Sequence, residues 1–211
     1  MTKKTTSAPA TPPNAPTAFA TPDLATTGQG IILLALPTGQ SRIKVATFFM
    51  DTHCLGVRKT TLTELGEHAQ LAPILSTLNA APIPLPDAKA IVEGALSFAK
   101  KLGLPPPARL STTLPLFGPI PATTPSPIAF GKNGKPFYTQ QEGDTPDFVE
   151  TVLARLEKFC GPDGFGFQLD EELEDWIDGE DHDEDAAEDW IDDADYDGDA
   201  DEDDGADTAE E

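Results

Sequence analysis

The chain has 211 residues, with 14 Lys and Arg against 37 Asp and Glu, and its net charge at pH 7 is −23. Residues 170–211 hold 25 of the acidic residues and neither Lys nor Arg, whereas residues 1–169 hold 14 basic and 12 acidic residues. The chain lacks the clustered cations of an ordinary nucleic-acid binder. Its longest apolar run, residues 31–36, is far shorter than the roughly 20 residues of a membrane-spanning helix. Composition therefore excludes direct nucleic-acid binding and a membrane span.

Residues 1–29 consist mainly of Thr, Ala and Pro. Such a segment buries too little apolar surface to offset chain entropy, so we expect a disordered leader. It also lacks the continuous apolar stretch of a secretory signal. Two cysteines, Cys54 and Cys160, are too few for a disulfide scaffold, which is typical of a cytoplasmic protein. We therefore expect a cytoplasmic location and two reduced thiols.

The first structural elements are two adjacent strands. Residues 31–36 form an apolar run, and residues 42–50 alternate between two faces with period two. A Pro-Thr-Gly-Gln turn at 37–40 separates them, so the pattern predicts a hairpin. We expect the chain to leave the second strand at residues 51–56.

Two helical regions follow. Residues 61–79 show helical spacing of apolar residues, interrupted at Pro73, which predicts two short helices. Residues 87–102 give the clearest helix, with Asp87 at its start and Gly103 at its end. An apolar stripe along this helix predicts that it packs on the sheet.

Residues 104–127 contain eight prolines and predict a long loop. Two alternatives stay open: an ordered wrap anchored by Leu114, Leu116 and Phe117, or a mobile flap.

The rest of the body repeats the pattern of strands and helix. Residues 128–130 and 136–138 flank an Asn-Gly turn, which predicts a second hairpin. Thr145 and Pro146 open a helix that ends at Gly161, and residues 165–167 could add an edge strand. The predicted fold is α+β: a small sheet of two β-hairpins packed on two or three helices, with disordered tails. The predicted organisation is a leader at 1–29, a globular domain at 30–169 and a disordered acidic tail at 170–211.

Several blocks of the body resemble a family of uncharacterised bacterial proteins. They are FFMDTHCLGVR at 48–58, AIVEGA at 90–95, LGLPP at 102–106, FGKNGKPFY at 130–138 and DTP at 144–146. The resemblance covers residues 30–160, leaving out the leader and the acidic tail. It implies no activity, because no chemistry is assigned to the family.

One short segment concentrates side chains that can act in catalysis or metal binding: Asp51, Thr52, His53 and Cys54. A His beside a carboxylate could act as a general base, and residues 51 and 53 share a face if the strand continues. Asp51 and His53 are therefore the candidate catalytic pair. The alternative is a strand end with one solvated acid and a buried thiol.

The loop at 131–135 fails the spacing of a phosphate-binding P-loop. Its Lys132 and Lys135 lie at a predicted hairpin tip, where they could contact an anion.

Asp193, Asp195, Asp197 and Asp204 follow the outline of a calcium loop. Asp replaces the bidentate Glu, and such a match arises easily in an Asp-rich segment. We therefore predict neither a metal nor a cofactor.

The sequence Glu-Asp-Trp-Ile-Asp occurs at 174–178 and again at 188–192, and these copies contain both tryptophans of the chain. Acidic segments with aromatic and aliphatic anchors are typical of motifs that fold onto basic or apolar grooves. We therefore take Trp176, Ile177, Trp190 and Ile191 as partner-binding candidates. The alternative is a solubilising tail whose tryptophans fold back onto the body.

The sequence favours a non-enzymatic interaction protein whose acidic tail binds a basic protein or imitates nucleic-acid charge. The alternative is a hydrolase or nuclease with its site near Asp51 and His53. The sequence does not indicate an oligomeric state.

Overall fold

The computed structural model describes residues 15–38 and 42–170. All of them belong to a compact unit that spans Met1–Glu171. The predicted calcium loop, both Trp-containing repeats and most of the predicted acidic tail lie outside the described residues. No helix in the described part of the chain is long and apolar enough to cross a bilayer.

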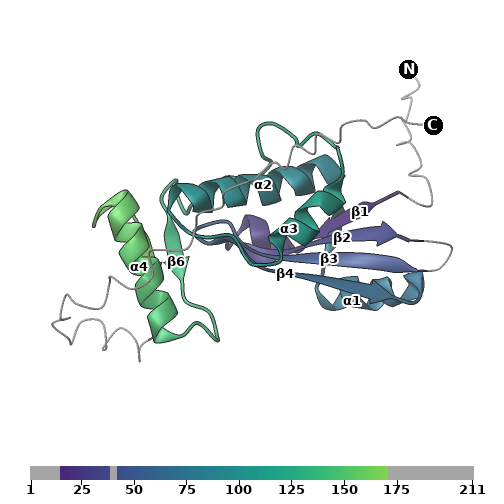
Figure 1. Ribbon diagram of the computed structural model, residues 1–211, viewed down its shortest axis with the longest axis horizontal. Coiled ribbons are helices and arrows are strands. Elements are labelled where there is room, and N and C mark those ends of the chain that lie inside the picture. Colours follow the sequence, from purple (N-terminus) through teal and green to yellow (C-terminus); the bar gives the residue numbers. More distant parts are fainter. Residues whose placement is uncertain (1–14, 39–41, 171–211) are drawn as a thin grey trace, which may run out of the picture. The chain divides into compact units, whose positions relative to one another are not determined.

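An antiparallel five-stranded sheet forms the centre of this unit (Figure 1). Its strand order is β4-β3-β2-β1-β5. The strands are β1 (Thr17–Ala20), β2 (Gln29–Pro37), β3 (Ile43–Asp51), β4 (Gly56–Leu65) and β5 (Ala81–Ile83). With its helices, described below, the sheet confirms the predicted α+β class.

The predicted first hairpin is confirmed by β2 and β3, which pair directly, with Leu33 opposite Thr47. The predicted leader boundary at residue 29 is wrong. Strand β1 begins at Thr17 and pairs with both β2 and β5, and a 3₁₀ turn at Pro22–Ala25 follows it. Ala18 and Leu24 are buried in the core, so tertiary pairing orders a segment whose composition alone indicates disorder.

The expected exit from the second strand at 51–56 is confirmed by a turn at residues 52–55, but the helix predicted to begin at residue 61 is wrong there. After a tight turn the chain returns as β4, which pairs with β3 along its length. Threonines at 60, 61 and 63 suit a strand because their branched side chains fit a pleated surface. Helical structure starts only at the 3₁₀ turn His68–Gln70 and α1 (Leu71–Thr77), where Pro73 lies in the first turn and is tolerated.

Helix α2 (Leu85–Lys101) confirms the clearest predicted helix and covers one face of the sheet (Figure 1). Its Val92 and Ala95 are fully buried and belong to one apolar cluster with Ile32 and Phe48. Burial of this stripe fixes the helix on the sheet.

The proline-rich loop is ordered, as one of the two alternatives predicts. It contains α3 (Leu110–Thr113) and a 3₁₀ turn at Leu114–Phe117. Phe117 is 2% exposed, and its ring centroid lies 5.5 Å from that of Phe48. Leu114 and Leu116 pack against the same cluster.

The predicted second hairpin is wrong. Residues 128–130 form no strand, although a single bridge joins Lys132 and Lys135 across the Asn-Gly turn. Strand β6 (Phe137–Thr139) pairs instead in parallel with β7 (Gly166–Gln168). The reason is that Ile128 and Phe130 pack against the main core and leave no strand for β6 to pair with.

Helix α4 (Pro146–Cys160) connects β6 to β7 and supplies the crossover that parallel pairing requires. It confirms the predicted helix, including its cap: the Thr145 hydroxyl accepts a hydrogen bond from the Phe148 amide at 3.3 Å. The predicted edge strand at 165–167 is present as β7, shifted by one residue.

Candidate functional site

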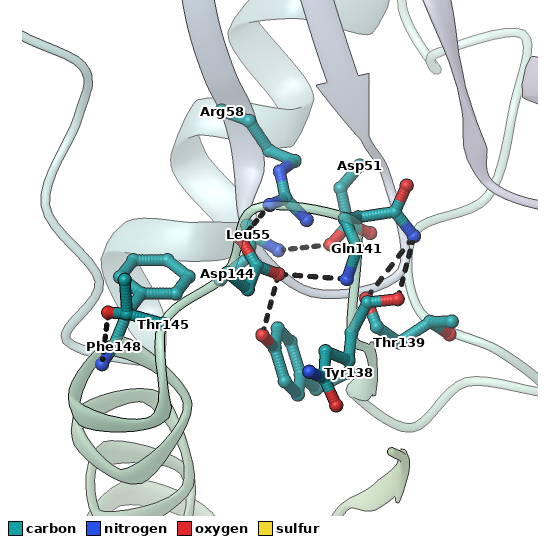
Figure 2. Close-up of polar contacts among 10 residues, drawn as sticks. Asp51, Leu55, Arg58, Tyr138, Thr139, Gln141, Asp144, Thr145 and Phe148 are labelled. Atoms are coloured by element: carbon teal, nitrogen blue, oxygen red, sulfur yellow. Dashed lines mark hydrogen bonds and ion pairs between the residues drawn. The ribbon is translucent and has the colours of Figure 1, made fainter. Parts of the chain in front are cut away.

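Asp51 ends β3 with a side chain that is 1% exposed. Its Oδ1 accepts hydrogen bonds from the backbone amides of His53 and Cys54, each at 3.0 Å, and its Oδ2 accepts one from Leu55 at 3.1 Å. Figure 2 shows the bond to Leu55. Burial raises the pKa of Asp51, and the three amide hydrogen bonds oppose that shift. The carboxylate thus closes the turn between β3 and β4. The expectation of a solvated acid at this strand end is wrong, because Asp51 is buried, whereas the expected buried thiol of Cys54 is confirmed.

The imidazole of His53 lies against Gly28, where an added Cβ would come within 2.4 Å of the ring. Burial lowers the pKa of His53; the Asp51 carboxylate raises it and Lys132 lowers it further. The hydrogen bond between His53 and Asp51 runs through the His53 backbone amide. This arrangement does not favour general-base chemistry, which needs the ring and the carboxylate to cooperate.

Both cysteines are free thiols. Cys54 is fully buried, and burial raises its pKa well above the ordinary range. Such a thiol is a poor nucleophile because the thiolate is the reactive form. Within residues 15–38 and 42–170, no group of three or more His, Cys, Asp or Glu side chains could hold a metal ion.

Asp144 organises a polar network that the sequence did not reveal (Figure 2). Its Oδ2 accepts hydrogen bonds from the Tyr138 hydroxyl at 2.8 Å and from the Gln141 amide at 3.0 Å. Its Oδ1 forms an ion pair with Nη2 of Arg58 on β4. The network joins the start of β4 to β6 and to the loop before α4. Arg58 and Asp144 are 86 residues apart, so no local spacing could have indicated their pairing.

Beside this network lies a cleft of about 760 Å³. Four segments line it: the start of β4, the loop after α2, the loop before α4, and one side of α4. Its lining residues are Leu55, Val57, Arg58, Lys59, Leu104, Pro105, Pro107, Glu142, Gly143, Asp144, Thr145, Phe148, Thr151, Val152 and Arg155. The predicted catalytic pair, Asp51 and His53, is not among them.

The cleft combines buried apolar side chains with charged walls. Leu55, Val57, Leu104 and Val152 are each at most 8% exposed. Phe148, by contrast, is 41% exposed. Three cationic and two anionic side chains also line the cleft. Its volume and composition are typical of small-molecule sites, which are apolar with a few placed polar groups.

The predicted anion-contact lysines are engaged within the chain. The Lys132 ammonium lies 3.8 Å from the centroid of the Phe137 ring. The Lys135 ammonium donates a hydrogen bond to the backbone carbonyl of Asp163 at 3.2 Å. Anion contact by these lysines stays a prediction.

The fold and the cleft define a small α+β domain with an antiparallel sheet, one long covering helix and an appended parallel β-α-β unit. Comparisons with protein-family models, curated proteins and solved structures give no match. The resemblance to uncharacterised bacterial proteins therefore stays a prediction, and function must be argued from the residues themselves.

Proposed function

We propose that the chain is a non-enzymatic, cytoplasmic interaction protein whose acidic segment, residues 170–211, binds a basic protein surface. The observation that carries this proposal is the sequence of that segment. It holds 25 acidic residues and no Lys or Arg, and it repeats Glu-Asp-Trp-Ile-Asp at 174–178 and 188–192.

Two physical effects would act one after the other during binding. A dense negative charge attracts a cationic surface from a distance and raises the association rate. At physiological salt this attraction extends about 8 Å, so it guides the encounter without fixing a geometry. Burial of Trp176 and Trp190 in apolar recesses of the partner then slows dissociation, because large aromatic side chains dominate binding energies.

A basic surface that normally holds nucleic acid fits this description. Such a surface presents spaced cations to phosphate charges, and a run of carboxylates can occupy the same positions. The segment would then act as a phosphate mimic at a partner's binding site.

The geometry at Asp51 weighs against the hydrolase or nuclease alternative. All three hydrogen bonds of the Asp51 carboxylate go to backbone amides of the adjoining turn. The alternative also requires Asp51 and His53 to line one pocket, and neither of them lines the cleft.

The proposal can be tested by fluorescence anisotropy of a labelled dodecapeptide of alternating Arg and Leu, titrated with the full chain. We expect the affinity to fall at least tenfold between low and physiological salt, as counter-ions compete. An affinity that stays constant with salt would contradict the electrostatic step.

A matched pair of variants separates the anchors from the charge. Substituting both Trp176→Ala and Trp190→Ala leaves the net charge unchanged and should weaken binding about tenfold or more. The control, Tyr196→Ala, removes an aromatic residue of the same segment outside the repeats and should bind like the native chain. Equal affinities for the double variant and the control would contradict the role of the two tryptophans as anchors.

A further inference from the structure

The cleft beside β4 and α4 has features of a ligand site that the proposed function does not use. Its volume is about 760 Å³, within the range of about 300–1,000 Å³ that holds small ligands. Its apolar side chains come from separate segments, including Val57 on β4, Leu104 after α2 and Val152 on α4. A site of this kind favours a ligand with an apolar body.

The charges around the cleft favour an anionic head group. Arg58, Lys59 and Arg155 line it together with Glu142 and Asp144. Asp144 is already paired with Arg58, which leaves two cations facing one carboxylate.

The two remaining cations are available for a ligand. Arg155 donates through Nη1 to the backbone carbonyl of Gly103, and a guanidinium has five N–H groups in all. The Lys59 ammonium lies 5.9 Å from the centroid of the Phe49 ring, which does not line the cleft, so this exposed side chain has to turn away from the ring to contact a ligand. Neither Lys59 nor Arg155 forms an ion pair with a carboxylate among the described residues.

We propose that this cleft binds a small amphipathic carboxylate, with its alkyl or aryl body on Val57, Leu104 and Val152 and its carboxylate held by Lys59 and Arg155. Guanidinium and ammonium groups form short, charge-assisted hydrogen bonds with carboxylates, and Arg can bind one in bidentate fashion. The half-exposed ring of Phe148 lines the same cleft and would cover the ligand's apolar body. This inference is independent of the acidic segment.

Octanoate is a suitable probe, because 1-octanol and octylammonium have the same number of carbon atoms and differ from it in the charge of the head group. The full chain, labelled with ¹⁵N, is titrated at physiological salt while amide chemical shifts are followed. We expect saturable shifts at Gly143, Thr151 and Arg155 with octanoate. Octanoate should bind at least fivefold more tightly than octanol, and octylammonium should bind most weakly.

The apolar part is tested by chain length. Each buried methylene strengthens binding about three- to fourfold, so octanoate should bind at least tenfold more tightly than butanoate. Equal affinities for the two acids would overturn the proposed apolar contact.

Two pairs of variants locate the site. Lys59→Gln should weaken octanoate binding about three- to tenfold, whereas Lys158→Gln, an exposed lysine of α4 outside the cleft, should not. Thr151→Trp should fill the cleft and abolish binding. Its control, Ala154→Trp, places the same ring at an exposed position of α4 outside the cleft and should leave binding intact.

Three results would overturn the proposal. The first is the absence of saturable shifts up to about 10 mM octanoate, which places any Kd above the millimolar range. The second is octylammonium binding as tightly as octanoate. The third is unchanged octanoate binding in Thr151→Trp when its circular dichroism spectrum matches that of the native chain.

Discussion

Replacing Asp51 tests whether this residue is structural or catalytic. The carboxylate accepts three backbone hydrogen bonds in the turn between β3 and β4. Asp51→Ala removes both acceptor oxygens and with them all three hydrogen bonds. Asp51→Asn keeps one oxygen and turns an NH₂ group toward a backbone donor.

The expected loss in the free energy of unfolding follows from the burial of the backbone amides that donate to Asp51. Cys54 is 0% exposed and Leu55 is 8% exposed, so water has little access to their amides. Each buried amide without a partner costs about 1–3 kcal/mol, and removing the desolvated carboxylate returns part of this. We expect Asp51→Ala to lower the free energy of unfolding by about 3 kcal/mol and Asp51→Asn by about 1–2 kcal/mol.

Urea unfolding followed by far-ultraviolet circular dichroism is the suitable assay. The chain's two tryptophans, Trp176 and Trp190, are not among the described residues, so circular dichroism, which follows the described helices and strands, is the more direct measure. Asp163→Ala, at an exposed position, is the control and should change stability by less than about 0.5 kcal/mol.

A stability of Asp51→Ala within about 0.5 kcal/mol of the native value would refute the structural role. So would an order in which the Asn variant is the less stable of the two. In either case Asp51 would again be a candidate for chemistry.

Three further predictions concern other positions. Thr145→Ala should destabilise the chain by about 1 kcal/mol in the same assay, because it removes the α4 cap, and Thr145→Ser should restore most of that loss. An Ala at Gly94 would place its Cβ 2.4 Å from the Phe130 ring, so Gly94→Ala should destabilise the native chain. The same substitution should stabilise a Phe130→Ala variant, in which the higher helix propensity of Ala acts without the clash. Additive effects of the two substitutions on the free energy of unfolding would contradict the contact. His53 has a lowered pKa when folded, so its neutral form stabilises the fold, and this contribution grows as pH rises from the folded pKa towards the ordinary value of 6.5. Urea unfolding of His53→Gln across this range should show a weaker pH dependence than the native chain, and an unchanged profile would contradict the assignment.

Local signals predicted helices α2 and α4 well, but they wrongly extended helical structure over residues 61–65 of β4. The start of α4 carries Thr145 and Pro146, a cap and a favoured first residue, and the structure shows that cap. The apolar stripe of α2 likewise predicted which side chains face the sheet. These features depend on neighbours within a few residues, so they can be read along the chain.

The candidate site was only partly accessible from sequence. The block around Asp51 and His53 drew attention because its residue types are those of catalysis. In the structure, the Asp51 carboxylate accepts hydrogen bonds within the turn between β3 and β4. The charged cleft lies next to that turn and is lined by Leu55. Arg58 and Asp144 went unnoticed because nothing along the chain relates two residues 86 positions apart.

The sequence by itself determined the α+β class, the central hairpin of β2 and β3 and the sharp change in charge at residue 170, because each depends on local periodicity or composition. The tertiary structure decided the partners of the short strands. Thr17–Ala20 becomes a strand because β2 and β5 satisfy its backbone on both sides. Strand β6 pairs with β7 because α4 brings the two strands together. The cleft is likewise built by several segments that are distant along the chain. Neither feature can be inferred from local spacing.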